Sequence, residues 1–380
     1  MQDQTLTFEQ GPIRPPNEAG SLLIRVSRNC PWNRCLFCPV YKTEKFSTRS
    51  LEEIKKDIDK IASGIEQLKA FSIEKGFGGE VTHKLLSMVY HQAPALLPVA
   101  NWLYLSEKSV FLQDADSTVY KGDKLAEIVR YIIEKIPGVE RVTTYSRAKS
   151  LARRSLEELK DIKEAGLSRV HIGLESGSDN VLEYMRKGVT AQEQIEGGAK
   201  AKEAGLIVSE YVMPGLGGKT WWQEHARETA RVLNQINPDF IRIRTLAIHP
   251  ASPLMEDWNQ GKFDPLTDDE IIQELKLFME SLNGINSAIY SDHILNLLEE
   301  LEGVLPHDKE DMLSIIDNYL ALYPQEKELF RLGRRTGLFR SLDDLSKKHL
   351  RGKAEDIYKQ LEARGITVDD FINDIRTRYL

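Results

Sequence analysis

The three cysteines of this 380-residue chain, Cys30, Cys35 and Cys38, fall within nine residues. They cannot build a disulfide framework, because pairing two of them leaves the third over, so their spacing indicates a metal site or a reactive site. A tetrahedral zinc site needs a fourth ligand, and none of the eight histidines lies at the short spacing of a zinc loop. Three soft thiolates suit a [4Fe-4S] cluster that keeps one iron open.

This segment resembles that of the radical S-adenosylmethionine (SAM) enzymes, in which three closely spaced cysteines leave one cluster iron for the cofactor. Phe37, directly before the third cysteine, matches an aromatic residue of that family, and the flanks 14–16 and 30–33 are similar to one uncharacterised branch of it. The spacing here is C-x4-C-x2-C, whereas C-x3-C-x2-C is usual, so we expect the first cysteine in a wider loop. The resemblance covers about residues 14–253.

The resemblance implies an oxidoreductase that uses one [4Fe-4S] cluster to cleave SAM reductively. The resulting 5′-deoxyadenosyl radical would abstract hydrogen from a small organic substrate, which stays unnamed. The resemblance also implies reduced flavodoxin or ferredoxin as electron donor and a reducing, anaerobic interior. Segment 173–180 and the turn after residue 212 are most similar to the oxygen-independent coproporphyrinogen III oxidase group. Because one cluster uses all three cysteines, no auxiliary cysteine-ligated cluster is expected.

Further cofactor-binding residues are expected just past the carboxyl ends of strands, where such barrels carry their chemistry. The alternation of side chains along the strand points Glu175 into the lumen of the predicted barrel, where the resemblance implies a polar residue for the ribose hydroxyls. Asp114 and Asp116 follow an apolar strand, where the family holds the methionine amino group. The segment 78–80 has the family's Gly-Gly-Glu letters, but no convincing strand precedes it. The alternatives are a helix-start carboxylate for Glu175 and turn formation for the aspartates.

Three more residues complete the predicted cofactor site. Lys187, or its neighbour Arg186, resembles the basic residue that meets the cofactor carboxylate, with a solvated charge near a helix end as the alternative. Gly215 belongs to a glycine-rich turn that resembles the one where backbone groups approach adenine. Arg244 shares a strand face with Arg242, and buried arginines need acceptors, which suits an anionic substrate or structural carboxylates equally. The sequence assigns no catalytic residue.

The elements that must position these residues alternate between strands and helices. Capping-box patterns at Ser50, Ser155 and Thr190 predict helix starts, and Gly166 and Gly205 each end a helix before an apolar strand. Predicted strands span residues 22–26, 110–113, 141–145, 169–174, 207–212 and 240–246. Six strands each followed by a helix require a parallel sheet with right-handed crossovers. We therefore expect an α/β fold, a partial (β/α)6 barrel with parallel strands plus a helical C-terminal region.

The predicted domain division has an N-terminal arm at 1–20, the partial barrel at 21–260 and a C-terminal region of helices only at 261–380, with 70–109 as an insertion or a lid. The composition, 41% hydrophobic, is that of a globular protein. No apolar run is long enough to cross a bilayer, and no leader pattern precedes residue 11, so we expect a cytoplasmic protein without a membrane span.

The formal net charge of −7 argues against a protein that holds nucleic acid by a basic face. Three alternatives to the leading hypothesis remain. One is an iron-sulfur electron carrier without a substrate, and another is a zinc-stabilised binding module. The third is a tRNA-modifying radical SAM enzyme, which the acidic balance disfavours.

Overall fold

The computed structural model describes residues 6–376, so the first five residues of the predicted arm and residues 377–380 lie outside it. The chain forms two compact units. Unit 1 comprises the chain up to Pro31, Thr43–Ile172 and Lys200–Ile207, and unit 2 comprises Trp32–Lys42, Gly173–Ala199 and the chain from Val208 onward.

The predicted strands are all present. They are β1 (Leu22–Arg25), β4 (Ser109–Gln113), β5 (Arg141–Ser146), β6 (Leu167–Glu175), β7 (Ile207–Val212) and β8 (Phe240–Ile243). In unit 1, β1 pairs with β4, β4 with β5 and β5 with β6, all parallel, and in unit 2 β7 pairs parallel with β8. The described strands form an eight-stranded, mostly parallel sheet in the order β1-β4-β5-β6-β7-β8-β9-β10, whose first and last strands are not neighbours. The predicted α/β class with an open, parallel sheet is confirmed.

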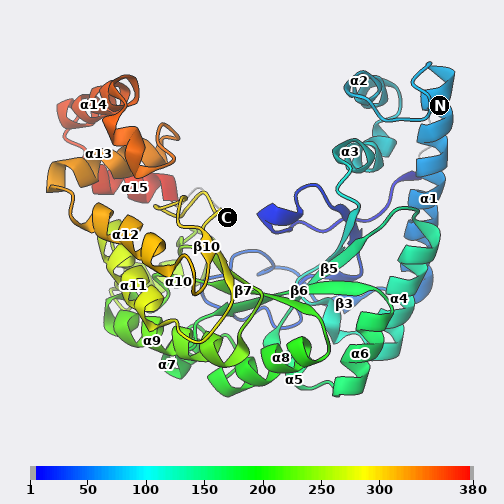
Figure 1. Ribbon diagram of the computed structural model, residues 1–380, viewed down its shortest axis with the longest axis horizontal. Coiled ribbons are helices and arrows are strands. Elements are labelled where there is room, and N and C mark those ends of the chain that lie inside the picture. Colours follow the sequence, from blue (N-terminus) through cyan, green and yellow to red (C-terminus); the bar gives the residue numbers. More distant parts are fainter. Residues whose placement is uncertain (1–5, 377–380) are drawn as a thin grey trace. The chain divides into compact units, whose positions relative to one another are not determined.

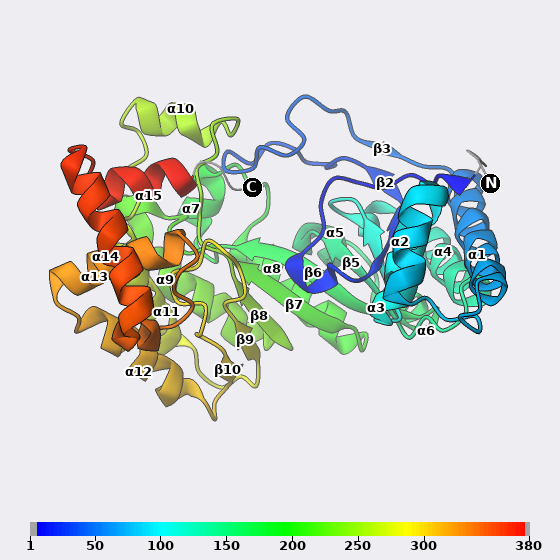
Figure 2. The ribbon, with the colours of Figure 1, turned by 90° about the horizontal axis from the view of Figure 1, so that it is seen from above.

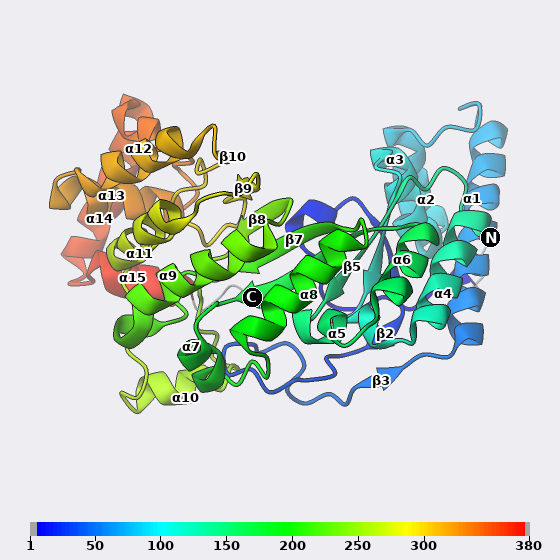
Figure 3. The same cartoon turned by 60° about the horizontal axis from the view of Figure 1, so that its bottom comes forward.

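Helices α1 and α6 of unit 1 begin at the predicted capping boxes, and Figure 1 labels them with the other helices of this unit. They are α1 (Leu51–Glu74), α2 (His83–Gln92), α3 (Leu97–Leu105), α4 (Gly122–Lys135), α5 (Ala148–Ala152) and α6 (Leu156–Glu164). Ser50 and Ser155 form complete capping boxes at α1 and α6. Helices α4 and α6 lie side by side (Figure 3). The predicted insertion at 70–109 contains the last residues of α1 and the whole of α2 and α3. Gly78 and Gly79 have positive φ angles in the turn after α1.

Unit 2 contains most of the remaining helices, which are α7 (Asp179–Tyr184), α8 (Ala191–Glu203, with its last residues in unit 1), α9 (Gly218–Ile236), α10 (Leu254–Asn259), α11 (Asp268–Ser281), α12 (Lys309–Leu320), α13 (Pro324–Arg335), α14 (Lys348–Ala363) and α15 (Val368–Arg376). Helices α14 and α15 both pack on α13 (Figure 2). The expectation of helices only after residue 261 is wrong, because β9 (Ala288–Tyr290) extends the parallel sheet from β8 and β10 (Gly303–Val304) pairs antiparallel with β9. Both strands are too short to show an alternating pattern.

The two glycines predicted to end a helix before a strand, Gly166 and Gly205, do so. Gly166 and Gly205 adopt φ angles of 116° and 82° at the ends of α6 and α8, a conformation that side chains disfavour. The predicted sixth strand is shorter than expected, since β8 ends at Ile243. Arg244 follows it directly, and its backbone N–H still donates to the Val212 carbonyl at 2.9 Å.

Two short strands flank the cysteine segment along the chain. They are β2 (Ser27–Arg28) and β3 (Ser47–Thr48), which pair antiparallel with each other. Short 3₁₀ turns occur at Pro16–Glu18, Pro94–Leu96, Ser117–Val119 and Leu342–Ser346. Within residues 6–376, no helix combines the length and apolar character that a bilayer span requires.

Candidate cofactor site

The cysteine segment runs between β2 and β3. Cys30 belongs to unit 1, and Cys35 and Cys38 belong to unit 2. All three are half-buried thiols rather than disulfides. Among the described residues, no group of three or more His, Cys, Asp and Glu side chains is arranged to hold a metal ion. Joint ligation by the three cysteines therefore stays a prediction from their spacing.

The donors of this segment fit an iron-sulfur cluster chemically. Lys42 donates from Nζ to the carbonyl oxygens of Cys35 at 2.7 Å and of Asn33 at 3.2 Å, so these two carbonyls are already satisfied within the segment. The three half-buried cysteines supply soft sulfur donors, which iron-sulfur clusters prefer. The ligands that this segment can provide to a cluster are therefore its cysteine sulfur atoms.

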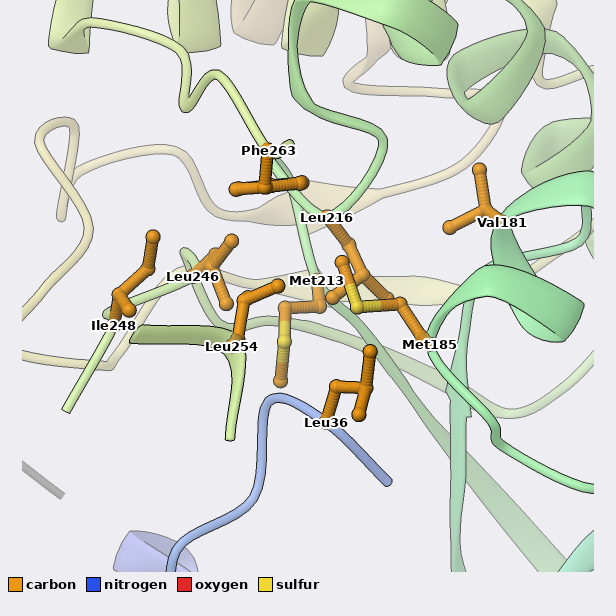
Figure 4. Close-up of a cluster of buried hydrophobic side chains, with 9 residues drawn as sticks. All are labelled: Leu36, Val181, Met185, Met213, Leu216, Leu246, Ile248, Leu254 and Phe263. Atoms are coloured by element: carbon orange, nitrogen blue, oxygen red, sulfur yellow. The ribbon is translucent and has the colours of Figure 1, made fainter. Parts of the chain in front are cut away.

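Within unit 2 the segment is anchored on the loop after α7. The indole Nε1 of Trp32 donates to the Arg186 carbonyl at 2.7 Å, and the Leu36 N–H donates to the Met185 carbonyl at 3.0 Å. Leu36 also accepts a hydrogen bond from the backbone N–H of Leu254 at 2.9 Å. Its side chain joins a buried apolar cluster with Met185, Met213, Leu216, Leu254 and others (Figure 4). Hydrogen bonds and apolar burial together fix the unit 2 part of the cysteine segment, residues 32–42, within that unit.

Three predicted cofactor residues lie together in unit 2. Lys187 Nζ forms an ion pair with Glu175 Oε1 at 3.2 Å, and the same ammonium lies 5.7 Å from the centre of the Phe37 ring. Only 11% of the Lys187 side chain and 13% of the Glu175 side chain are exposed. A Cβ atom at Gly173 would come within 2.5 Å of Glu175 Oε1, so a glycine two residues earlier makes room for the pair. The sequence predicted each residue but not that Glu175 and Lys187 pair.

Glu210 of β7 belongs to the same neighbourhood, and the sequence analysis missed it. It is 1% exposed, and neither of its carboxylate oxygens has a hydrogen-bond partner among the described residues. Burial raises its pKa well above the ordinary value, and the charge of Glu175 adds to the shift while Lys187 opposes it. A glutamate inside the apolar strand 207–212 was the signal that could have identified it.

Gly215 lies in the predicted turn after β7, with a φ angle of 90°. Its backbone N–H donates to Glu274 Oε2 of α11 at 2.5 Å. Glu274 is 1% exposed, and burial raises its pKa to about 8. The glycine-rich turn is therefore tied to a helix that follows it by more than fifty residues, a contact that the sequence pattern did not predict.

Asp114 and Asp116 are fully buried in unit 1, and protein groups occupy both carboxylates. Asp114 Oδ2 accepts from Arg25 Nη2 at 2.6 Å and from the backbone N–H of Asn29 at 3.0 Å, directly before Cys30. Asp116 accepts from the backbone N–H of Thr118 at 3.2 Å, which is the turn geometry considered as its alternative. Burial raises the pKa of Asp116, although hydrogen bonds from Ser150 and Thr118 oppose the shift. A cofactor role for either aspartate stays a prediction.

The two arginines of the predicted sixth strand differ in their side-chain partners. Arg242 is paired within unit 2, because Nη1 donates to Asp292 at 2.8 Å and its guanidinium lies against the Tyr290 ring at 5.0 Å, although its buried Nε has no hydrogen-bond partner among the described residues. Arg244 is half-buried, and within the described part of the chain its side chain makes no hydrogen bond or ion pair. Arg244 therefore keeps the capacity to bind an anion.

The family model of the radical SAM superfamily matches residues 24–230, which is more than half of the chain. The chain belongs to the radical SAM superfamily. The matched range includes the cysteine segment, Glu175, Lys187 and Gly215. Members of this family are enzymes that bind a [4Fe-4S] cluster and SAM. The predicted superfamily, enzyme class and cofactors are confirmed at this level.

Individual relatives match over smaller parts. A tRNA uridine(34) acetyltransferase from Methanocaldococcus jannaschii is 25% identical over 118 residues, 31% of this chain and 22% of the relative. A tRNA-2-methylthio-N(6)-dimethylallyladenosine synthase from Neisseria gonorrhoeae is 26% identical over 203 residues, 51% of this chain and 43% of the relative. The chain thus spans less than half the length of either. A structure of coproporphyrinogen III oxidase from Escherichia coli aligns with a TM-score of 0.42 and 16% identity, over 68% of this chain and 52% of that one.

Proposed function

We propose that this radical SAM enzyme holds one [4Fe-4S] cluster through Cys30, Cys35 and Cys38 and cleaves SAM reductively to act on a small organic substrate. Bound there, such a cluster would supply the single electron for reductive cleavage of the carbon–sulfur bond of SAM, which would yield methionine and a 5′-deoxyadenosyl radical able to take a hydrogen atom from the substrate. Reduced flavodoxin or ferredoxin supplies the electron. The observation that carries the proposal is the ion pair of Glu175 and Lys187 beside Phe37, within the range matched to the family.

Glu175 and Lys187 would bind the two ends of SAM. The Lys187 ammonium suits the methionine carboxylate, and the Glu175 carboxylate suits the ribose hydroxyls. In the structure each is the partner of the other at 3.2 Å, so the cofactor would replace part of this contact. Because both side chains are largely buried, charge-assisted hydrogen bonds to a ligand are stronger here than at the surface. Gly215 would meet adenine, and Asp114 or Asp116 the methionine amino group.

The substrate class rests on the charge balance. Arg244, half-buried and without a side-chain partner in the described chain, supports an anionic group on the substrate. The net charge of −7 favours a small molecule over nucleic acid. Relatives named as tRNA-modifying enzymes keep tRNA modification as the second candidate, although each match covers under half of the relative. The cytoplasm, with its reducing conditions, is the proposed location.

The test is anaerobic reconstitution with iron and sulfide, followed by incubation with dithionite and SAM. We expect 5′-deoxyadenosine and methionine in equal amounts, measured by liquid chromatography and mass spectrometry. Iron-loaded protein that forms no 5′-deoxyadenosine would support an electron carrier instead. A colourless protein containing zinc would support the binding-module alternative.

A further inference from the structure

A buried polar network in unit 2 joins the loops that follow β6 and β7. His225 of α9 is at its centre, with Nδ1 2.9 Å from Ser176 Oγ and Nε2 3.0 Å from the Met213 carbonyl oxygen. Ser176 comes directly after Glu175, and Met213 begins the turn that contains Gly215. One imidazole therefore bridges the two loops to which the proposed function assigns the ribose and the adenine of SAM.

The partners fix the protonation of this histidine. A carbonyl oxygen only accepts, so Nε2 carries the hydrogen and Nδ1 is the acceptor. Two hydroxyls can donate to Nδ1, those of Ser176 and of Thr229, the latter at 3.1 Å. Each hydroxyl also accepts a backbone N–H, from Ser178 at 3.0 Å and from Gly177 at 2.9 Å. Burial lowers the pKa of His225 to about 4, which agrees with a neutral ring. The network therefore orders the loop after β6 through its backbone as well.

Glu274 of α11 extends the network to the glycine-rich turn. Its Oε2 accepts the Gly215 N–H at 2.5 Å, and its Oε1 lies 3.9 Å from His225 Nε2 without a hydrogen bond. Residues Val212, Pro214, His225, Thr229, Glu274 and Phe278 line one small cavity here. Glu274 lies beyond residues 24–230, so a helix outside the family match supports a turn inside it.

We propose that His225 and Glu274 are positioning residues, which hold the loops after β6 and β7 in the shape that SAM binding requires. This inference rests on the proposed function of those loops. Neither side chain needs to touch the cofactor. Removing the Glu274 carboxylate leaves the buried Gly215 N–H without its acceptor, and removing the His225 imidazole leaves the Met213 carbonyl without its donor. Because buried backbone groups must be satisfied, either change loosens a loop rather than removing a ligand contact. Such a loss lowers cofactor affinity without removing thiolates from the cluster.

The experiment compares Glu274→Gln with Glu274→Leu in the full chain, reconstituted with iron and sulfide. The amide oxygen of glutamine can still accept the Gly215 N–H, whereas leucine cannot. We expect Glu274→Leu to raise the dissociation constant of SAM about tenfold, the loss of roughly one buried hydrogen bond. Glu274→Gln should stay within about twofold of the parent. Iron and sulfide content should equal that of the parent in both. The matched control is Glu280→Ala, a surface position on the same helix.

Two further variants keep the test decisive if Glu274→Leu does not fold. Ser176→Ala and Thr229→Val remove the hydroxyls that face His225 Nδ1 at little cost in volume, and each should weaken SAM binding severalfold with the cluster retained. Equal SAM affinity in the parent, Glu274→Leu and both hydroxyl variants would overturn the inference. A parent protein that holds iron but binds no SAM would instead overturn the proposed function.

Discussion

The indole of Trp32 donates to the carbonyl oxygen of Arg186, 154 residues further along the chain, at 2.7 Å. Gly188, two residues after Arg186, lies beneath the same indole, where an added Cβ would come within 2.1 Å of the ring. The Trp32 indole therefore packs so closely on residue 188 that any side chain larger than that of glycine would displace the indole. A loop that contains no cysteine therefore holds Trp32, two residues after Cys30, in place.

Substituting Gly188 by alanine should displace Trp32 and lower cluster loading. Gly188 has a φ angle of 67°, so alanine adds a left-handed strain of about 1–2 kcal/mol besides the clash. Gly261 provides the control, because its φ angle is 68° and nothing lies within 4 Å of its Cβ position. We expect Gly261→Ala to lose only stability, whereas Gly188→Ala also loses iron and sulfide per chain. Equal iron content in the two variants would show that the Trp32 contact does not support the cysteines.

Replacing any one of Cys30, Cys35 and Cys38 by alanine should abolish formation of 5′-deoxyadenosine from SAM. The chain has three cysteines in all, so no spare thiolate can substitute. Iron content and the visible absorption of the cluster should fall together with cleavage. A fully active Cys30→Ala protein would mean that the longer x4 spacing removes this residue from the cluster.

Glu175→Ala should separate cofactor binding from cluster assembly. A carboxylate that accepts ribose hydroxyls contributes about 1.5–3 kcal/mol, so we expect a loss of SAM affinity of roughly ten- to a hundredfold. Iron and sulfide should stay near the parent level. The variant Lys187→Ala completes a double-mutant cycle, in which the 3.2 Å pair predicts effects that do not add. Unchanged SAM binding in Glu175→Ala would leave this carboxylate as only the partner of Lys187.

The stability of the protein should depend on pH through His225. Its pKa is lowered from the ordinary 6.5 to about 4 by burial, so the unfolded state takes up the proton first as pH falls. The contribution is complete above pH 6.5 and is lost progressively down to pH 4, with a slope of about 1.4 kcal/mol per pH unit at most. Urea unfolding at pH 7 and pH 5 measures it. His225→Gln should show a smaller loss between these two pH values than the parent, and an equal loss would rule out this assignment.

Much of the fold follows from local signals. The capping boxes at Ser50 and Ser155 and the glycines at 166 and 205 act within a few residues, so the sequence alone locates those helix ends. The candidate cofactor residues could be named one at a time, because Glu175 and Asp114 stand at strand ends and Lys187 follows a short helix. Their pairing could not be found, since the contact between Glu175 and Lys187 depends on how the chain turns after β6.

Contacts between residues far apart in the chain could not be predicted from the sequence for the same reason. His225 lies in the middle of an amphipathic helix, where its pattern is that of any core position, and only the fold brings it to Ser176 and Met213. The three-residue strand β9 carries no periodicity that separates it from a loop. Glu210 was the exception, because a carboxylate within an apolar strand is visible without the fold.

The register of β1 has a consequence for how the protein is made. Leu22 pairs with Val110, so the strand that precedes the cysteines has no strand partner until β4 has been synthesised. On the ribosome, at about 5–20 residues per second, the three thiols therefore emerge several seconds before β1 can pair with β4. During that interval they are open to metal delivery, and equally to oxidation.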